Sequence, residues 1–143
     1  MKKPFRKVLL VDDDPVTNYL HNIVFSEMAI AERIITLTNA PEALAYIQTN
    51  CADGNAAKGE CLDLIVLDVN MPVLSALEFL AELKEIQQGY SVYIDVVVVS
   101  STTFRDVDAF EQYGVKGMIE KPLTEEKLQL ILGQQLNKPY TAG

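Results

Sequence analysis

The sequence predicts an α/β domain in which a parallel β-sheet lies between two layers of helices. Three short runs are continuously apolar, with no polar alternation: Val8–Val11, Leu64–Leu67 and Val96–Val99. This pattern is typical of strands that are covered on both faces. Apolar residues at helical spacing follow each run. Strict alternation of strands and helices favours a parallel sheet with right-handed crossovers.

Two more polar strands, 33–37 and 117–120, bring the predicted number of strand–helix units to five. The three apolar strands should be central and the two polar ones should be edges. This gives a parallel five-stranded sheet of order 2-1-3-4-5, the flavodoxin-like three-layer (βα)5 arrangement.

Helical stripes and capping residues place the five helices between these strands. The first helix should follow the Asp14-Pro15 pair and bury its apolar stripe. The second should begin after Asn39, the third should be capped by Ser75, and Gly114 should end the fourth. The predicted stripes are Val16, Leu20, Ile23, Val24 and Met28; Ala43, Leu44 and Ile47; Leu77, Leu80, Leu83 and Ile86; Phe104, Val107, Phe110 and Tyr113; and Leu128, Ile131, Leu132 and Leu136.

Length and composition indicate one globular domain. We expect a single domain over residues 1–143, with a core of about 7–136 and a frayed C-terminal tail. The net charge of −8 argues against nucleic-acid binding. With no membrane span and no secretory signal in sight, we expect a cytoplasmic protein. In that compartment Cys51 and Cys61 should be two free thiols on a long connection, 49–63.

Chemically active side chains follow four of the predicted strands. Asp12 and Asp13 follow the first and Asp68 follows the third, which places them on either side of the point where strand order reverses. Clustered carboxylates need a cation, and oxygen ligands suit Mg²⁺. Ser100 and Lys121, after the fourth and fifth strands, would add a hydroxyl donor and an ammonium. Together these groups predict a site for phosphoryl chemistry.

Each of these residues also has an ordinary structural interpretation. The run 12–14 could be a capping cluster, which suits Asp14 but not all three aspartates because one cap needs one side chain. Asp68 alone would be a polar loop residue, Ser100 could cap a helix, and Lys121 could be a solvated lysine. The joint placement of suitable residues at four strand ends favours the site.

The motifs Val-Asp-Asp-Asp-Pro, Leu-Asp-Val-Asn-Met-Pro, Val-Ser-Ser and Lys-Pro resemble the receiver domain of two-component response regulators. The resemblance covers about 7–136 and suggests a stand-alone receiver. It implies a partner histidine kinase or histidine phosphotransfer protein, an unknown downstream protein target, and homodimers on phosphorylation. It also implies signalling through the surface of the fourth helix, fourth and fifth strands and fifth helix. Self-modification of this kind is not turnover, so we do not expect an enzyme.

The resemblance assigns a role to each site residue. Asp68 would be the phosphoacceptor, and Asp13, Asp68 and the backbone carbonyl of Asn70 would bind Mg²⁺ directly. Asp12 would act through a metal-bound water, and Ser100 and Lys121 would contact the phosphoryl group. The Lys121–Pro122 bond would be cis. Backbone N–H groups near Asn70 and Ser101 would complete the cradle, and Asn70 and Thr102 occupy positions that tune phosphoryl lifetime.

Three features depart from the family pattern. Met118 stands where the family usually has the aromatic residue that moves with the hydroxyl, Ser75 and Ala76 replace an Asp-Gly pair, and the 49–63 connection is long. Met118 leaves open a second hypothesis, an interaction module that keeps the pocket but does not switch. An aspartate-nucleophile phosphohydrolase would need a general acid where Asn70 stands. A flavodoxin would need a phosphate-binding loop free of the three aspartates.

Overall fold

The computed structural model describes residues 3–52 and 61–136 and confirms the alternation of strands and helices. The strands are β1 (Phe5–Val11), β2 (Ala31–Leu37), β3 (Leu64–Asp68), β4 (Asp95–Ser100) and β5 (Gly117–Glu120). The helices are α1 (Pro15–Met28), α2 (Ala40–Asn50), α3 (Ala76–Tyr90), α4 (Val107–Gln112) and α5 (Glu125–Leu136).

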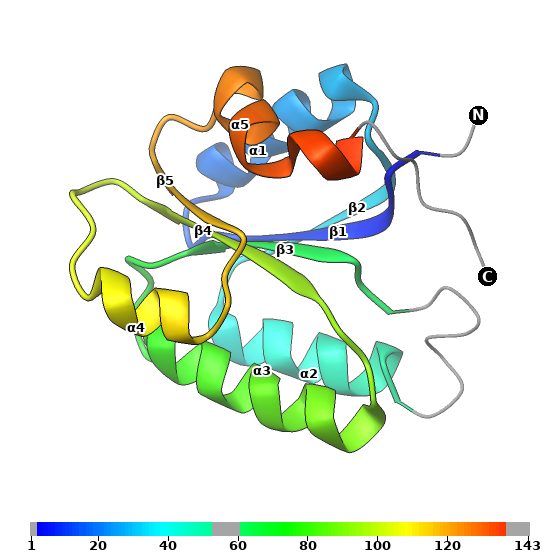
Figure 1. Ribbon diagram of the computed structural model, residues 1–143, viewed down its shortest axis with the longest axis vertical. Coiled ribbons are helices and arrows are strands. Elements are labelled where there is room, and N and C mark those ends of the chain that lie inside the picture. Colours follow the sequence, from blue (N-terminus) through cyan, green and yellow to red (C-terminus); the bar gives the residue numbers. More distant parts are fainter. Residues whose placement is uncertain (1–2, 53–60, 137–143) are drawn as a thin grey trace.

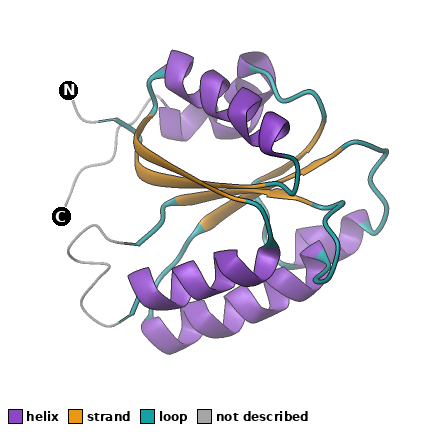
Figure 2. Cartoon of the chain, turned by 180° about the vertical axis from the view of Figure 1, so that it is seen from behind, coloured by secondary structure: helices purple, strands orange, loops and turns teal. Residues whose placement is uncertain are grey.

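All neighbouring strands pair in parallel in the predicted order β2-β1-β3-β4-β5. Helices α1 and α5 cover one face of the sheet, and α2, α3 and α4 cover the other (Figure 1). Seen from behind, the sheet lies between these two layers (Figure 2). Along β1, Leu9 packs into the core beneath α2 and α3, and Val8 and Leu10 pack into the core beneath α1 and α5. The central strands are therefore buried on both faces, as their apolar runs predict.

Three predicted helix caps are present. The side chain of Asp14 accepts a hydrogen bond from the Val16 backbone at the start of α1, and Asn39 accepts one from Glu42 at the start of α2. Ser75 and Glu78 form a reciprocal capping box at the start of α3. The third helix therefore begins normally without the Asp-Gly pair of the family pattern.

The predicted buried stripe of α1 is wrong in part. Val16 and Leu20 are exposed, and the buried positions of this helix are Asn18, His21 and Phe25. Asn18 tolerates burial because its amide donates hydrogen bonds to two backbone carbonyls. The helix thus turns a partly polar face to the sheet at the end nearest the predicted site.

The fourth helix is shorter than its apolar stripe predicts. It begins only at Val107, after Asp106, which has a positive φ of 54° and no side-chain capping bond. Phe104 lies in the preceding loop and packs edge-on against Phe110, with ring centroids 6.1 Å apart. Gly114, with φ 73°, follows the helix as predicted.

The expectation of free thiols is also wrong: Cys51 and Cys61 form a disulfide. Cys51 caps the C-terminus of α2 and Cys61 precedes β3, and both side chains are buried in the core on that side of the sheet. Their Cα atoms lie 4.5 Å apart, within the range a disulfide spans. The long connection itself falls largely on 53–60, outside the described residues. In the part of the chain that the structure describes, no helix combines the length and apolar character needed to cross a membrane.

Candidate phosphoacceptor site

The predicted site residues converge at the carboxyl edge of the sheet. Asp12 follows β1, Asp68 is the last residue of β3, and Ser100 is the last residue of β4. Lys121 directly follows β5 and reaches back across the edge. This convergence follows from the parallel topology, because every strand ends at the same edge.

Three carboxylates form a compact acidic cluster. One oxygen from each of Asp12, Asp13 and Asp68 lies within 4.8 Å of the others. Asp12 and Asp68 are 1% and 2% exposed, whereas Asp13 is exposed to solvent. An all-oxygen donor set that is open on one side fits a partly hydrated Mg²⁺ ion. The side-chain ligands proposed from the sequence are therefore brought together.

Lys121 is the cation paired with this cluster. Its Nζ lies 2.8 Å from Asp12 Oδ2 and 3.6 Å from Asp68 Oδ1. Burial alone lowers the pKa of the ammonium, but the hydrogen bond to Asp12 and the charges of both carboxylates outweigh it and raise the pKa. Lys121 therefore stays positively charged beside the acceptor.

The environment of Asp68 opposes its ionisation. Burial raises its pKa above the ordinary 3.8, and the charges of Asp12 and Asp13 act in the same direction. The backbone N–H of Asn70, which donates to Oδ1 at 3.0 Å, and the charge of Lys121 lower it. Among the described residues, no hydrogen bond reaches Oδ2. A nearby cation would help to hold the carboxylate ionised while leaving this oxygen open to an electrophile.

The Ser100 hydroxyl is held by its neighbours. It donates to Asn70 Oδ1 at 3.2 Å and accepts from the Thr102 backbone at 3.1 Å. The Thr102 hydroxyl lies 3.2 Å away; because the single hydrogen of Ser100 is directed to Asn70, Thr102 donates to it. Ser101 bonds the same Asn70 oxygen through its backbone N–H, at 3.1 Å, and through its hydroxyl. Asn70 thus joins the ends of β3 and β4.

Two buried polar residues of α1 were not identified from the sequence. The Asn18 amide donates at 3.0 Å to the backbone oxygens of both Asp12 and Leu37. This clamps the ends of β1 and β2 and supports the loop that carries the acidic cluster. Burial lowers the pKa of His21, partly offset by the charge of Asp12. The only indication of this in the sequence is that Asn18 and His21 are polar residues three positions apart in a predicted helix.

Two further expectations concern the strand that leads to Lys121. The Lys121–Pro122 peptide bond is cis, as predicted. Met118, on β5, is partly buried against the core that contains Phe110. Met118 therefore packs as an apolar side chain at the position where the family pattern has an aromatic one.

Comparison with known proteins identifies the family. The sequence matches the response regulator receiver domain over residues 8–132. A probable C4-dicarboxylate response regulator, DctR, from Halalkalibacterium halodurans is 31% identical over 93% of this chain. The chain spans only 52% of the length of that relative.

Solved structures agree with this result. A two-component response regulator from Cytophaga hutchinsonii superposes with a TM-score of 0.78 at 25% identity, covering 94% of this chain and 98% of its own. The receiver domain of the histidine kinase CKI1 from Arabidopsis thaliana, solved with Mg²⁺ and BeF₃⁻, shares the fold. It gives a TM-score of 0.73 at 20% identity and covers 93% and 91% of the two chains. With its fold, strand order and acidic pocket, the chain belongs to the response regulator receiver domains of two-component systems.

Proposed function

We propose that Asp68 accepts a phosphoryl group from a phosphohistidine on a histidine kinase or histidine phosphotransfer protein. The observation that carries this proposal is the buried Asp68 carboxylate, with two further carboxylates within 4.8 Å and Lys121 Nζ 3.6 Å away. A cluster of close carboxylates, two of them buried, is costly without a cation and is typical of a site that works with a bound cation.

Each residue has a part in the transfer. Asp68 Oδ2 attacks phosphorus; the new P–O bond forms as the P–N bond to the donor imidazole breaks, and the imidazole leaves with that electron pair. Lys121 neutralises charge on the phosphoryl oxygens, and the Ser100 hydroxyl donates a hydrogen bond to one of them. At the same edge, the backbone N–H of Asn70 donates to Asp68 Oδ1 and that of Ser101 donates to Asn70 Oδ1.

Mg²⁺ would be held by Asp13, Asp68 and the Asn70 backbone carbonyl, with Asp12 acting through water. When bound, the ion offsets the negative charge that gathers as the phosphoryl group approaches the carboxylates. The choice of Mg²⁺ is supported by the all-oxygen donor set and by the open side of the cluster at Asp13.

The product is a modified receiver rather than a released compound, so we propose a signalling domain and not a turnover enzyme. Phosphorylation would change contacts with a downstream protein, and the α4–β5–α5 surface remains the proposed site of that change. We also propose that the protein acts in the cytoplasm; the Cys51–Cys61 disulfide is the observation that weighs against this location.

The test is phosphorylation with acetyl phosphate and Mg²⁺, followed by intact-mass measurement. Wild type should gain one phosphoryl group, and Asp68→Ala should gain none. Asp108→Ala, which removes an exposed carboxylate on α4, is the matched control and should behave as wild type. No gain on wild type, or equal gain on Asp68→Ala, would overturn the proposal.

The non-switching interaction module remains a second proposal because Met118 replaces the usual aromatic. Backbone NMR with and without beryllofluoride distinguishes the two. Shifts confined to residues around Asp68 would support the module, and shifts that extend to α4 and β5 would support a switch.

A further inference from the structure

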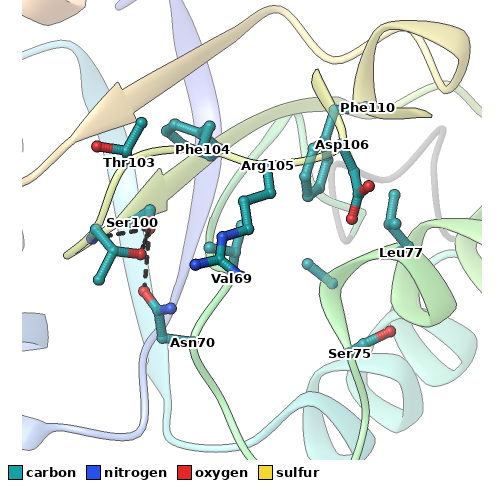
Figure 3. A pocket seen from close by; sticks show the side chains of 12 residues that line it. Val69, Asn70, Ser75, Leu77, Ser100, Thr103, Phe104, Arg105, Asp106 and Phe110 are labelled. Atoms are coloured by element: carbon teal, nitrogen blue, oxygen red, sulfur yellow. Dashed lines mark hydrogen bonds between the residues drawn. The ribbon is translucent and has the colours of Figure 1, made fainter. Parts of the chain in front are cut away.

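A pocket of about 640 Å³ opens beside the acceptor, between the loops that follow β3 and β4. It shares Asn70 and Ser100 with the phosphoacceptor site. The lining also includes apolar side chains: Phe104 lies near Ser100, and Leu77 and Phe110 lie farther from it, beside Asp106 (Figure 3). A group bound at the acidic cluster therefore borders a pocket whose lining is partly polar and partly apolar.

Arg105 supplies the only cationic side chain among the residues that line this pocket. Figure 3 shows its side chain extending across the pocket toward Asn70 and Val69. The carboxylate of Asp106 projects to the other side, toward Leu77. Within the described residues the guanidinium makes no ion pair. A long cation that extends over a pocket without a carboxylate partner is available for an anion.

The charge of the phosphoacceptor site changes on phosphorylation in a way that calls for one more cation. Three carboxylates and Lys121 carry two net negative charges, which one divalent cation neutralises. Phosphorylation removes the Asp68 carboxylate charge and adds a phosphoryl group of about −2. About one negative charge is then left over, next to the wall that Asn70 shares with the Arg105 pocket.

We propose that Arg105 is a second phosphoryl-binding cation, which contacts the phosphoryl group on Asp68 from the pocket side. This inference rests on the proposed phosphoacceptor function. The guanidinium fork donates paired hydrogen bonds to phosphoryl oxygens, a geometry that a point-charge ammonium such as Lys121 does not offer. Arg105 thereby favours the phosphorylated form and makes no contribution to binding of the metal alone.

The test is a titration of the intact chain with beryllofluoride at saturating Mg²⁺, followed by ¹⁹F NMR. Arg105→Gln should bind beryllofluoride about tenfold more weakly than wild type, the loss expected for one charge-assisted hydrogen-bonding group that is partly open to solvent. Arg105→Lys, which keeps the charge but not the fork, should lie between the two. Lys84→Gln is the control, because it removes an exposed cation from α3, outside this pocket.

Binding of Mg²⁺ alone, measured by calorimetry, separates this role from a structural one. Arg105→Gln should bind Mg²⁺ as tightly as Lys84→Gln does, whereas a variant with a damaged site would lose affinity for both probes. Equal beryllofluoride affinity in wild type, Arg105→Gln and Lys84→Gln would overturn the role of Arg105 and leave Asp68 as acceptor. Failure of wild type itself to bind beryllofluoride would overturn both proposals.

Discussion

Replacing Asp68 with asparagine should make the metal-free protein more stable. Asparagine keeps the shape of the side chain and an oxygen that can accept the Asn70 N–H bond. What it removes is a buried charge, and burial is the largest reason why the pKa of Asp68 is raised. The folded state therefore carries a cost for the ionised carboxylate that the variant does not carry.

The size of this cost follows from the geometry of the cluster. The three carboxylate oxygens lie within 4.8 Å of one another, so at an effective dielectric constant of about 20 each pairwise repulsion is at least about 3.5 kcal/mol before screening by solvent. The attraction between Asp68 and Lys121 at 3.6 Å is about 4.6 kcal/mol on the same basis. Asp13 is exposed, so solvent screens its share strongly. The repulsion from the other carboxylates and the attraction to Lys121 nearly cancel. The cost of burying the Asp68 charge is then uncompensated, so Asp68→Asn should raise the free energy of unfolding by about 1–2 kcal/mol.

The pH dependence gives this prediction a sign that can be checked. Because the folded pKa of Asp68 lies above its ordinary value of 3.8, the folded state binds the proton more tightly than the unfolded state. The contribution of Asp68 to stability is therefore complete below pH 3.8 and is lost as pH rises through the folded pKa. The gain in unfolding free energy of Asp68→Asn over wild type should therefore grow as pH rises from 3.8 through the folded pKa of Asp68, and stay constant at higher pH.

Urea unfolding with chelator present measures the difference, with Asp108→Asn as a control of equal charge change on the exposed surface of α4. Saturating Mg²⁺ should stabilise wild type, by about 2.7 kcal/mol at a hundredfold excess over Kd, and should stabilise Asp68→Asn much less. The reasoning is refuted if Asp68→Asn is less stable than wild type without metal at about pH 7.5, well above the ordinary carboxyl pKa of 3.8.

Three other perturbations test separate parts of the structure. Reduction of the Cys51–Cys61 disulfide, which closes a loop with a sequence separation of 10, should lower the unfolding free energy by about 3 kcal/mol; a urea curve unchanged by reductant would contradict this. Asn18→Ala removes one buried and one partly buried hydrogen bond and should cost about 2–3 kcal/mol by urea unfolding and weaken Mg²⁺ binding measured by calorimetry. Unaltered Mg²⁺ affinity would show that Asn18 does not support the acidic loop. Gly117→Ala places a Cβ 2.5 Å from the Ile131 side chain and should lower stability by about 1–3 kcal/mol, with partial recovery in the double variant that also carries Ile131→Ala.

The sheet and the acidic cluster were predictable because both depend on strongly patterned segments. A fully apolar strand such as Leu64–Leu67 must be central, and the residue after it must lie at the carboxyl edge. The predicted sheet therefore placed Asp12 and Asp68 close together, and the structure confirms this. Residue roles that depend on direction, such as the free Oδ2 of Asp68, require coordinates.

The wrong predictions each have a separate physical cause. On α1, apolar content suggested that Val16 and Leu20 face the sheet, but hydrogen bonds to strand ends allow Asn18 to be buried instead. The stripe of α4 included Phe104, although the chain becomes helical only after Asp106. The cysteines were assigned by compartment, whereas their pairing depends on where α2 ends and β3 begins.

The three partners of the Ser100 hydroxyl give the unphosphorylated site a preferred state. To donate to a phosphoryl oxygen, Ser100 must withdraw its one hydrogen from Asn70, and a change of rotamer toward the phosphoryl group would also release the two donors of Thr102. At about 1 kcal/mol for each net hydrogen bond, the released rotamer lies about 2–3 kcal/mol higher in free energy. It is then populated at about one per cent, in the range typical of a minor state that a ligand selects. A phosphoryl group on Asp68 would therefore act on an equilibrium that already exists, by supplying Ser100 with a stronger, charged acceptor.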